Sequence, residues 1–256
     1  MRLRVLLLLL VLASPAAALA APSGQATRGL HLFGRYCAAC HGPNGEGQTQ
    51  SPAARVGGGP ARDQKVQAGL GPSLRGVGAL AADFYVRTGY MPLKRVGLQP
   101  RRSRPLLGPQ EIDALVAYVA SLGHGPAVPS PRPQRGSLSE GQHLFTQNCA
   151  GCHQVVAAGG YVTGAVPPSL GDATAVQIAE AVRLGPYVMP VFSKKRISDR
   201  QLDSIVRYVQ WTKHPDDRGG WSLGHVGPVP EGLVTWFIAA GALVAVCLGI
   251  GKRLRG

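Results

Sequence analysis

Two short motifs carry residue types that could attach haem: Cys37-Ala38-Ala39-Cys40-His41 and Cys149-Ala150-Gly151-Cys152-His153. Two thiols three positions apart can each form a thioether bond to a vinyl group of haem, and the histidine that follows is held beside the iron as its proximal ligand. Paired disulfides or zinc sites use related spacings, but a zinc site normally needs four protein ligands, and the second pair is missing here. The motifs therefore predict two covalently bound c-type haems, held by Cys37, Cys40, Cys149 and Cys152, with His41 and His153 on the irons.

One methionine follows each motif and could supply the second axial ligand of a six-coordinate haem iron. Met91 lies 50 positions after His41, Met189 lies 36 positions after His153, and each is followed by a proline. Methionine is more often a core filler than a ligand. Because the two internal methionines occupy equivalent places in a repeat, we expect Met91 and Met189 to be the distal iron ligands.

Other histidines could compete for the irons. His31 and His143 each lie six positions before the first cysteine of a motif, on a predicted helix, and we expect both to face solvent. His124, His214 and His225 have no counterpart in the other half of the chain and are not expected to be ligands.

Matching Pro-Ser-Leu segments lie between each motif and its methionine, and they contain Pro72 and Pro168. A ligating histidine usually donates its other ring N–H to a nearby acceptor, which sets the orientation of the ring. The carbonyl of each proline could be that acceptor, although a plain turn proline explains the segment equally well.

The two motifs belong to an internal repeat. Residues 29–42 align with residues 141–154 without gaps, and residues 112–119 align with residues 202–209. The second copy is shorter by about 22 residues, all in loops. Residues 29–36, 83–88 and 110–122 are expected to be helical, the last because Ile112, Leu115, Val116 and Val119 form an apolar stripe at helical spacing.

Composition excludes two other classes of protein. The net charge is +14, but aromatic residues make up only 6% and are not interleaved with the basic ones, so nucleic-acid binding is not expected. Four of the five cysteines lie in the haem motifs and Cys247 lies in an apolar run, which leaves no thiols for a disulfide framework.

Both ends of the chain carry membrane signals. Arg2 and Arg4, an apolar stretch and Ala18-Leu19-Ala20 are typical of an export signal with a cleavage site. Residues 232–251 have no charge and are long enough to span a bilayer. The basic residues that follow place the C-terminus in the cytoplasm by the positive-inside rule, and hence the haem domains on the outer face.

These observations predict an all-α chain with two tandem haem domains and one transmembrane helix. The linker contains four prolines and is expected to be extended and semi-rigid. The predicted segments are a signal peptide (1–21), a first haem domain (22–124), a Pro-rich linker (125–136), a second haem domain (137–213), a pre-membrane loop (214–231), a transmembrane helix (232–251) and a basic tail (252–256).

Each half resembles a class I cytochrome c domain, with its haem motif, Pro-Ser-Leu segment, Met-Pro loop and terminal helix. The whole chain resembles the dihaem cytochrome c subunit of the actinobacterial cytochrome bc complex. This resemblance rests on Gly71-Pro72-Ser73-Leu74, Thr88-Gly89-Tyr90-Met91-Pro92, Gly185-Pro186-Tyr187-Val188-Met189-Pro190 and the segment 221–232 before a single C-terminal span.

The resemblance implies a membrane-anchored electron-transfer subunit of a quinol–cytochrome c reductase that does no bond-making chemistry of its own. Its implied partners are the cytochrome b and Rieske iron–sulfur subunits, and the dicopper subunit of a haem–copper oxidase that receives the electrons. An alternative is a dihaem electron-transfer subunit of another dehydrogenase or oxidase. A haem gas sensor or dihaem peroxidase needs an open iron site, which the two Met-Pro loops disfavour.

Overall fold

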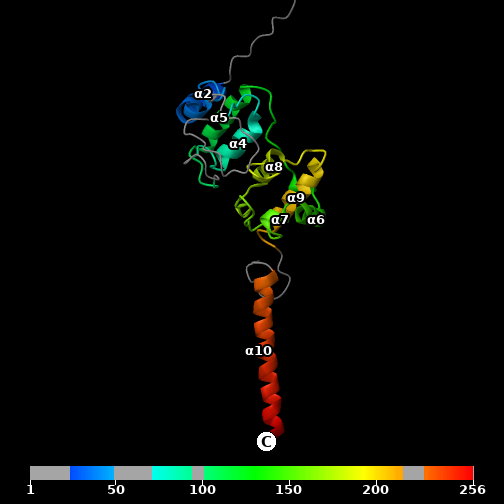
Figure 1. Cartoon of the computed structure of the whole chain (residues 1–256). Helices are drawn as coiled ribbons and strands as arrows, with labels where there is room; N and C mark the ends of the chain where they lie inside the picture. The colour runs from blue at the N-terminus through cyan, green and yellow to red at the C-terminus, as the bar shows by residue number, and fades with distance from the viewer. Residues whose placement is uncertain (1–23, 49–70, 94–100, 216–227, 256) are drawn as a thin grey trace, which may run out of the picture.

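The computed structural model describes residues 24–48, 71–93, 101–215 and 228–255 (Figure 1). In this part of the chain the regular structure is helical, apart from one isolated bridge between Val162 and Ala165. The predicted all-α class is therefore confirmed. The expected signal peptide and most of the expected pre-membrane loop lie outside the described residues.

The first domain is built on two crossing helices, α2 (Gly24–Tyr36) and α5 (Pro109–Ser121). They cross closely at Gly29, where a Cβ atom would overlap the backbone carbonyl of Ala114. One turn along α2, the buried ring of Phe33 packs on Tyr118 with 5.1 Å between ring centroids. Both helices lie where the repeat predicted them, although α2 begins before residue 29.

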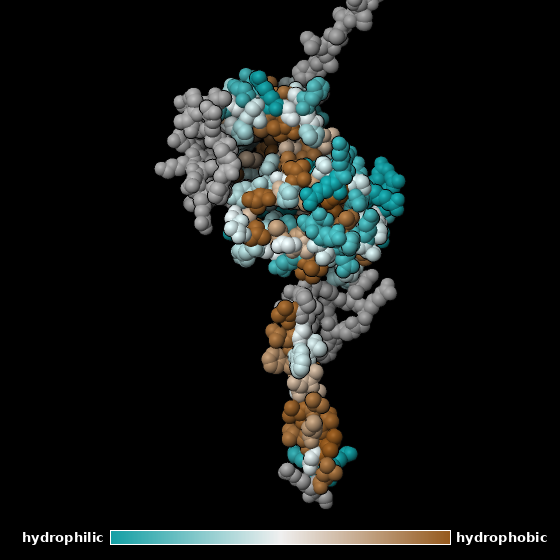
Figure 2. All heavy atoms as spheres, turned by 45° about the vertical axis from the view of Figure 1, so that its right-hand side comes forward, coloured by the Kyte–Doolittle hydropathy of each residue, from teal (hydrophilic) through white to brown (hydrophobic). Residues whose placement is uncertain are grey.

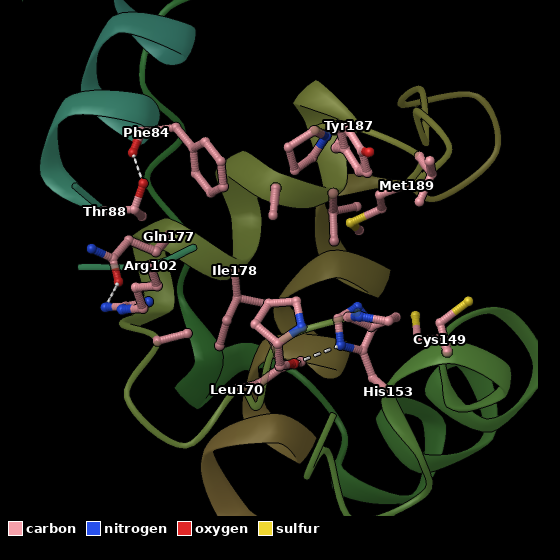
Figure 3. Close-up of a pocket in the computed structure, with 18 of the residues that line it drawn as sticks. Phe84, Thr88, Arg102, Cys149, His153, Leu170, Gln177, Ile178, Tyr187 and Met189 are labelled. Carbon is pink, nitrogen blue, oxygen red and sulfur yellow. Dashed lines mark hydrogen bonds between the residues drawn. The ribbon is translucent and has the colours of Figure 1, made fainter. Parts of the chain in front are cut away.

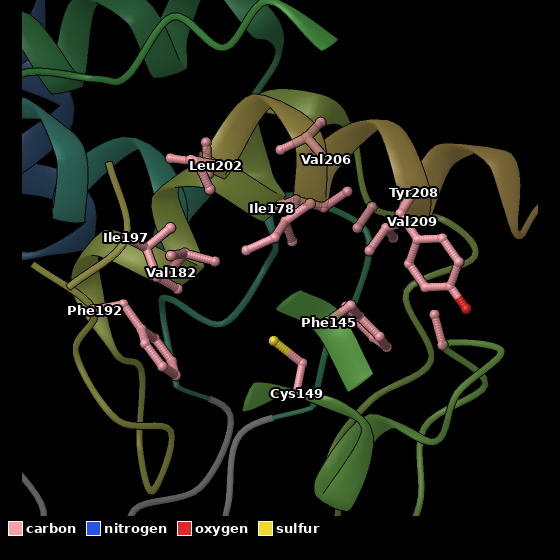
Figure 4. Packing of buried hydrophobic residues seen from close by; sticks show 14 residues of the cluster. Phe145, Cys149, Ile178, Val182, Phe192, Ile197, Leu202, Val206, Tyr208 and Val209 are labelled. Carbon is pink, nitrogen blue, oxygen red and sulfur yellow. The ribbon is translucent and has the colours of Figure 1, made fainter. Parts of the chain in front are cut away.

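The second domain repeats this crossing with α6 (Leu138–Asn148) and α9 (Asp199–Trp211). A Cβ atom on Gly141 would overlap the carbonyl of Ser204, and Phe145 packs on Tyr208 with 5.4 Å between ring centroids. Figure 4 shows these rings beside Cys149 and the aliphatic side chains of α9. The predicted repeat is thus present in the packing as well as in the sequence.

One helix from each domain meets the other at the joint between them. These are α4 (Gly78–Arg87) and α8 (Ala175–Leu184), which precede the two Met-Pro segments and pack against each other (Figure 1). The expected helix at 83–88 begins earlier, at Gly78. The backbone N–H of Leu80 donates to the carbonyl of Pro126, so the linker packs along the first turns of α4.

The rest of the linker is held by the second domain. It contains a short 3-10 helix, η1 (Pro133–Arg135), and the backbone N–H of Arg132 donates to Asp203 at 2.6 Å. The side chain of Arg207 also donates to the carbonyl of Gly136. The linker is therefore anchored to a helix of each domain.

The C-terminal helix α10 (Pro228–Arg255) is the predicted membrane segment. Residues 232–254 have a mean hydropathy of 2.4, and none of the most apolar part is buried against the rest of the protein. Figure 2 shows hydrophobic side chains along this helix and hydrophilic ones near its C-terminal end. This length and composition are those of a membrane-spanning helix.

Candidate functional site

Each haem motif forms a single helical turn that continues the preceding helix. The turns are α3 (Ala38–His41) and α7 (Ala150–His153). The backbone N–H of Cys37 donates to Phe33, and that of Cys149 donates to Phe145, so each motif is tied to the aromatic residue at the helix crossing. This contact positions both thiols and the histidine of each motif relative to the domain core.

The orientation of both histidine rings is set by proline carbonyls. His41 Nδ1 lies 2.7 Å from the carbonyl oxygen of Pro72, and His153 Nδ1 lies 3.1 Å from that of Pro168. Because a carbonyl only accepts, Nδ1 carries the proton in each ring and Nε2 is left as the metal-binding nitrogen. The proline carbonyls are thus the acceptors that the sequence left undecided. Burial lowers the pKa of His153, which favours the neutral imidazole that iron ligation needs.

Two glycines that the sequence did not single out bring the Pro-Ser segments close to the motifs. Gly47 and Gly159 each donate a backbone N–H to the carbonyl of the motif histidine, His41 or His153. Both have positive φ angles, +82° and +85°, and a Cβ atom on either would lie within 2.6 Å of the backbone of the Pro-Ser segment. Their shared position, six residues after each histidine, was a readable signal.

The four motif thiols are unpaired, and each pair has one shielded and one accessible member. Cys40 and Cys152 are exposed, whereas Cys37 and Cys149 are partly or fully buried. Burial, with a smaller contribution from the second thiol of each pair, raises the pKa of Cys37 and of Cys149 to about 11.

The second site opens into a cavity of about 500 Å3, a size typical of cofactor pockets. All four residues predicted for the second haem line it: Cys149, Cys152, His153 and Met189. Figure 3 shows Met189 and His153 projecting toward each other from opposite sides of the open space. A neutral imidazole, a thioether and two unpaired thiols in an apolar cavity form a donor set that fits a covalently attached haem.

The same cavity reaches the first domain. Its lining includes Met91 and Pro72 of the first site, together with the aromatic rings of Phe84, Tyr85 and Tyr90. Cys37, Cys40 and His41 do not line this cavity, and His41 is connected to it through its hydrogen bond to Pro72. The structure therefore brings the Met-Pro segments of both domains to one common space.

Arg102 lines one side of this cavity and forms hydrogen bonds to the other domain. Its guanidinium donates to the backbone carbonyl of Asp172 at 2.9 Å. It also donates to the side-chain oxygen of Gln177 at 2.8 Å (Figure 3), and both acceptors belong to the second domain. Arg102 itself belongs to the first domain and lines the cavity. It therefore joins the two domains at the edge of the shared site.

The competing histidines are placed away from the cavity. His31 and His143 are exposed on α2 and α6, as expected. Neither they nor His124 and His214 line the cavity, and His225 lies outside the described residues.

Known proteins resemble both halves of the chain. Residues 26–123 match the family described as cytochrome c, and residues 136–209 match the family described as cytochrome c oxidase, cbb3-type, subunit III. The cytochrome bc1 complex cytochrome c subunit of Mycobacterium leprae is 35% identical over 234 residues, which cover 88% of this chain and 74% of that protein. The corresponding subunit of Corynebacterium diphtheriae is 32% identical over 243 residues, which cover 88% and 80%.

More distant proteins also match. The cbb3-type cytochrome c oxidase subunit CcoP of an Azospirillum strain is 29% identical over 202 residues, which cover 71% of this chain and 60% of that protein. Among solved structures, a chain of the Kuenenia stuttgartiensis reducing HAO-like protein complex gives a TM-score of 0.35 at 15% identity, covering 72% of this chain and 95% of that chain. This last likeness is too low to bear on the fold.

Proposed function

The chain belongs to the family of cytochrome c subunits of the cytochrome bc1 complex, and we propose that it binds two c-type haems covalently and conducts electrons through them. Each haem supplies an iron that alternates between the ferric and ferrous states. The side chains that hold the first haem are Cys37, Cys40, His41 and Met91, and those that hold the second are Cys149, Cys152, His153 and Met189.

The protein groups around each iron control its orientation and its potential. The hydrogen bond from Nδ1–H to the carbonyl of Pro72 or Pro168 holds each imidazole in one tautomer and makes its Nε2 more basic. Met91 and Met189, as ligands of the two irons, would favour the ferrous state and raise the reduction potential. The buried aromatic pairs Phe33–Tyr118 and Phe145–Tyr208 support the motif turns from the domain cores.

The shared cavity is the observation that carries this proposal. Met91 and Met189 line one space between the domains, so both haems would approach each other there and not on opposite faces of the molecule. Electron transfer between them then needs no diffusion of a separate carrier, because both redox centres belong to one chain.

We assign the partner proteins from the family resemblance, and the location of the domains from the two terminal segments. The electron donor is the Rieske iron–sulfur subunit of a complex with cytochrome b, and the acceptor is the dicopper subunit of a haem–copper oxidase. The segments 1–21 and 232–251 act as export signal and membrane anchor, which place residues 22–124 and 137–213 on the outer face. The basic tail, with Lys252 and Arg253, then lies in the cytoplasm.

A second candidate is the dihaem subunit of an oxidase of the cbb3 type. The match of residues 136–209 to that family favours it, as does the similarity to CcoP. The lower identity and the smaller covered share of CcoP favour the bc1 assignment.

Purification of the complex with its native membrane partners tests the proposal. A denatured chain should retain two haems, and the complex should oxidise a quinol and reduce oxygen at full rate without added soluble cytochrome c. A Cys247→Ser variant is the matched control, because it removes the one cysteine that lies outside the haem motifs. Strict dependence of the rate on added cytochrome c would contradict the proposed conduction.

A further inference from the structure

Two buried acidic residues meet where the haem domains join. Asp83 on α4 and Glu180 on α8 are 5% and 0% exposed. Each is the sixth residue of its ten-residue helix. The contact between α4 and α8 brings the two carboxyl groups together.

The two carboxyl groups differ in their partners. Asp83 accepts hydrogen bonds from Nε and Nη2 of Arg87 at 2.7–3.0 Å, and Arg87 also donates to Asp113 at 2.7 Å. No donor in the described part of the chain reaches either oxygen of Glu180. An ionised carboxylate buried without a donor is strongly unfavourable, so only Asp83 has an environment suited to the anion.

The residue one helical turn after each acid explains this asymmetry. Four positions after Asp83 lies Arg87, whereas four positions after Glu180 lies Leu184. The neighbouring Arg183 is directed elsewhere, since it donates to the carbonyls of Phe192 and Ile197 and pairs with Asp199. The second copy therefore offers Glu180 no cation of its own.

The charged groups on the other helices packed against α8 likewise leave Glu180 without a cation of its own. From α4, Asp83 and Arg87 act on Glu180, and Asp113 of α5 shares Arg87. Three charged groups of α9 have partners of their own: Asp199 with Arg183 and Lys194, Asp203 with the backbone of Arg132, and Arg207 with the backbone of Gly136. The fourth, Arg200, is exposed.

Burial is the largest cause that raises the pKa of Glu180 well above the ordinary value of a glutamic acid, and the charge of Asp83 and a hydrogen bond to it raise it further. The nearby Arg87 lowers it, but by less. A hydrogen bond between two carboxyl groups requires a donor, and the donor is the protonated one. Of the two, Glu180 is the group whose surroundings favour the protonated form.

We propose that Glu180 and Asp83 form a proton-binding site that closes the joint between the haem domains. The protonated Glu180 donates to the ionised Asp83, and this hydrogen bond links α8 to α4. A groove of about 660 Å3, lined by Asp83, Arg87 and Gln177 among others, reaches the Asp83 side of the pair and offers protons a route to solvent. The ligand is a proton, and the site is separate from the haem ligands.

The direction of the pH dependence follows from linkage. When the joint opens, water reaches Glu180 and its pKa returns toward the ordinary value, about 4.3. Closure therefore takes up a proton at any pH between that value and the raised pKa of the closed joint. The stabilisation is fully present below the ordinary value and is lost as the pH rises through the raised pKa.

Infrared spectroscopy of the full-length haem-loaded protein tests the proton site directly. The wild type should show a protonated carboxyl band at neutral pH that disappears at alkaline pH. The band should be absent in Glu180→Gln and retained in Asp172→Asn, a control that removes an exposed acid at the same joint. In Asp83→Asn the band should titrate at lower pH by at least about one unit, because Arg87 is then free to face Glu180.

The distance between the two oxidised haem irons, measured by pulsed electron paramagnetic resonance, tests closure. In the wild type, the mean iron–iron distance should lengthen and its distribution should broaden as the pH rises. In Glu180→Gln the distance should stay short at every pH, because the glutamine amide still donates to Asp83. This distance measurement rests on the proposed function, because it needs two bound haems, whereas the infrared band does not. A separate haem count distinguishes failure of the proposed function, in which haem is missing, from failure of the proposed proton site. A band that persists in Glu180→Gln, or identical pH dependence of the distance in both proteins, would overturn the proposal.

Discussion

The two haem domains share their support for the motif histidine and differ in what surrounds it. In both, a proline carbonyl accepts from Nδ1 and a glycine with positive φ sits six residues after the histidine. The hydrogen bond is shorter in the first domain, 2.7 Å against 3.1 Å. The second domain reaches its methionine through a shorter chain, and all four of its predicted haem-holding residues line the shared cavity.

This difference indicates which features the repeat has retained. The groups that orient the ring and the small residues at the helix crossing are the same, because any change there moves the iron ligand itself. The loops and the charges at the joint have diverged, since they alter the environment of a haem without removing its ligands. Two similar sites in one chain can thereby differ in potential.

The largest expected effect is loss of one haem. Substitution of both thiols of either motif, Cys37→Ala with Cys40→Ala or Cys149→Ala with Cys152→Ala, should leave one haem per chain after denaturing electrophoresis. The second pair should also destabilise its domain more, because Cys149 packs within the hydrophobic core. A doubly substituted protein that still carried two haems would rule out the attachment sites.

Exchange of the distal ligand should have the next largest effect. Met91→His and Met189→His should each lower the potential of one haem by a sizeable part of the roughly 0.8 V range that axial ligands span. A redox titration of each variant, followed in the visible spectrum, separates the two domains. An unchanged potential in a variant would exclude that methionine as ligand, and equal shifts in both haems would show that the sites are not independent.

The sequence indicated the parts of each site more fully than their relation to each other. The motifs and the methionines are predicted ligands because each half repeats them at short range, and the structure supplies the proline contacts that the sequence left open. The start of α4 at Gly78 could not, because the helix is extended by contact with Pro126 of the linker. The shared cavity and the pairing of Asp83 with Glu180 depend on how two domains pack, and local periodicity carries no information about that packing.

The glycines near the Pro-Ser segments give a smaller and more specific test of the comparison. Gly47→Ala and Gly159→Ala should each destabilise their own domain by about 1–3 kcal/mol, because a Cβ is added at positive φ and against backbone atoms. Each should also change the spectrum of only one haem, since the proline that holds His41 or His153 is displaced. Thermal unfolding monitored at both haems measures this.

Gly164→Ala is the matched control for that experiment. Its φ of +83° is nearly the same, but no atom lies within 4 Å of the added Cβ. It should therefore show the cost of backbone strain without the spectral change. If Gly164→Ala altered a haem spectrum as much as Gly159→Ala, contact with the Pro-Ser segment would not be the cause.

The smallest expected effect concerns the start of the terminal helix in each domain. Ser198 caps α9 by accepting from the backbone N–H of Gln201, whereas Gly108 precedes α5 without a side chain and only the carboxylate of Glu111 completes the turn. Ser198→Ala should lower the stability of the second domain by about 1 kcal/mol. Gly108→Ser should raise the stability of the first domain by up to about 1 kcal/mol, because the extended φ and ψ of Gly108 suit any residue and the added Cβ meets only Glu111 at 3.5 Å.

The melting temperatures of the two domains, each followed at its own haem, should move by several degrees in opposite directions, each variant affecting one domain only. A shift of both domains by either variant would show that the joint couples their unfolding, and the two halves would then have to be treated as one cooperative unit.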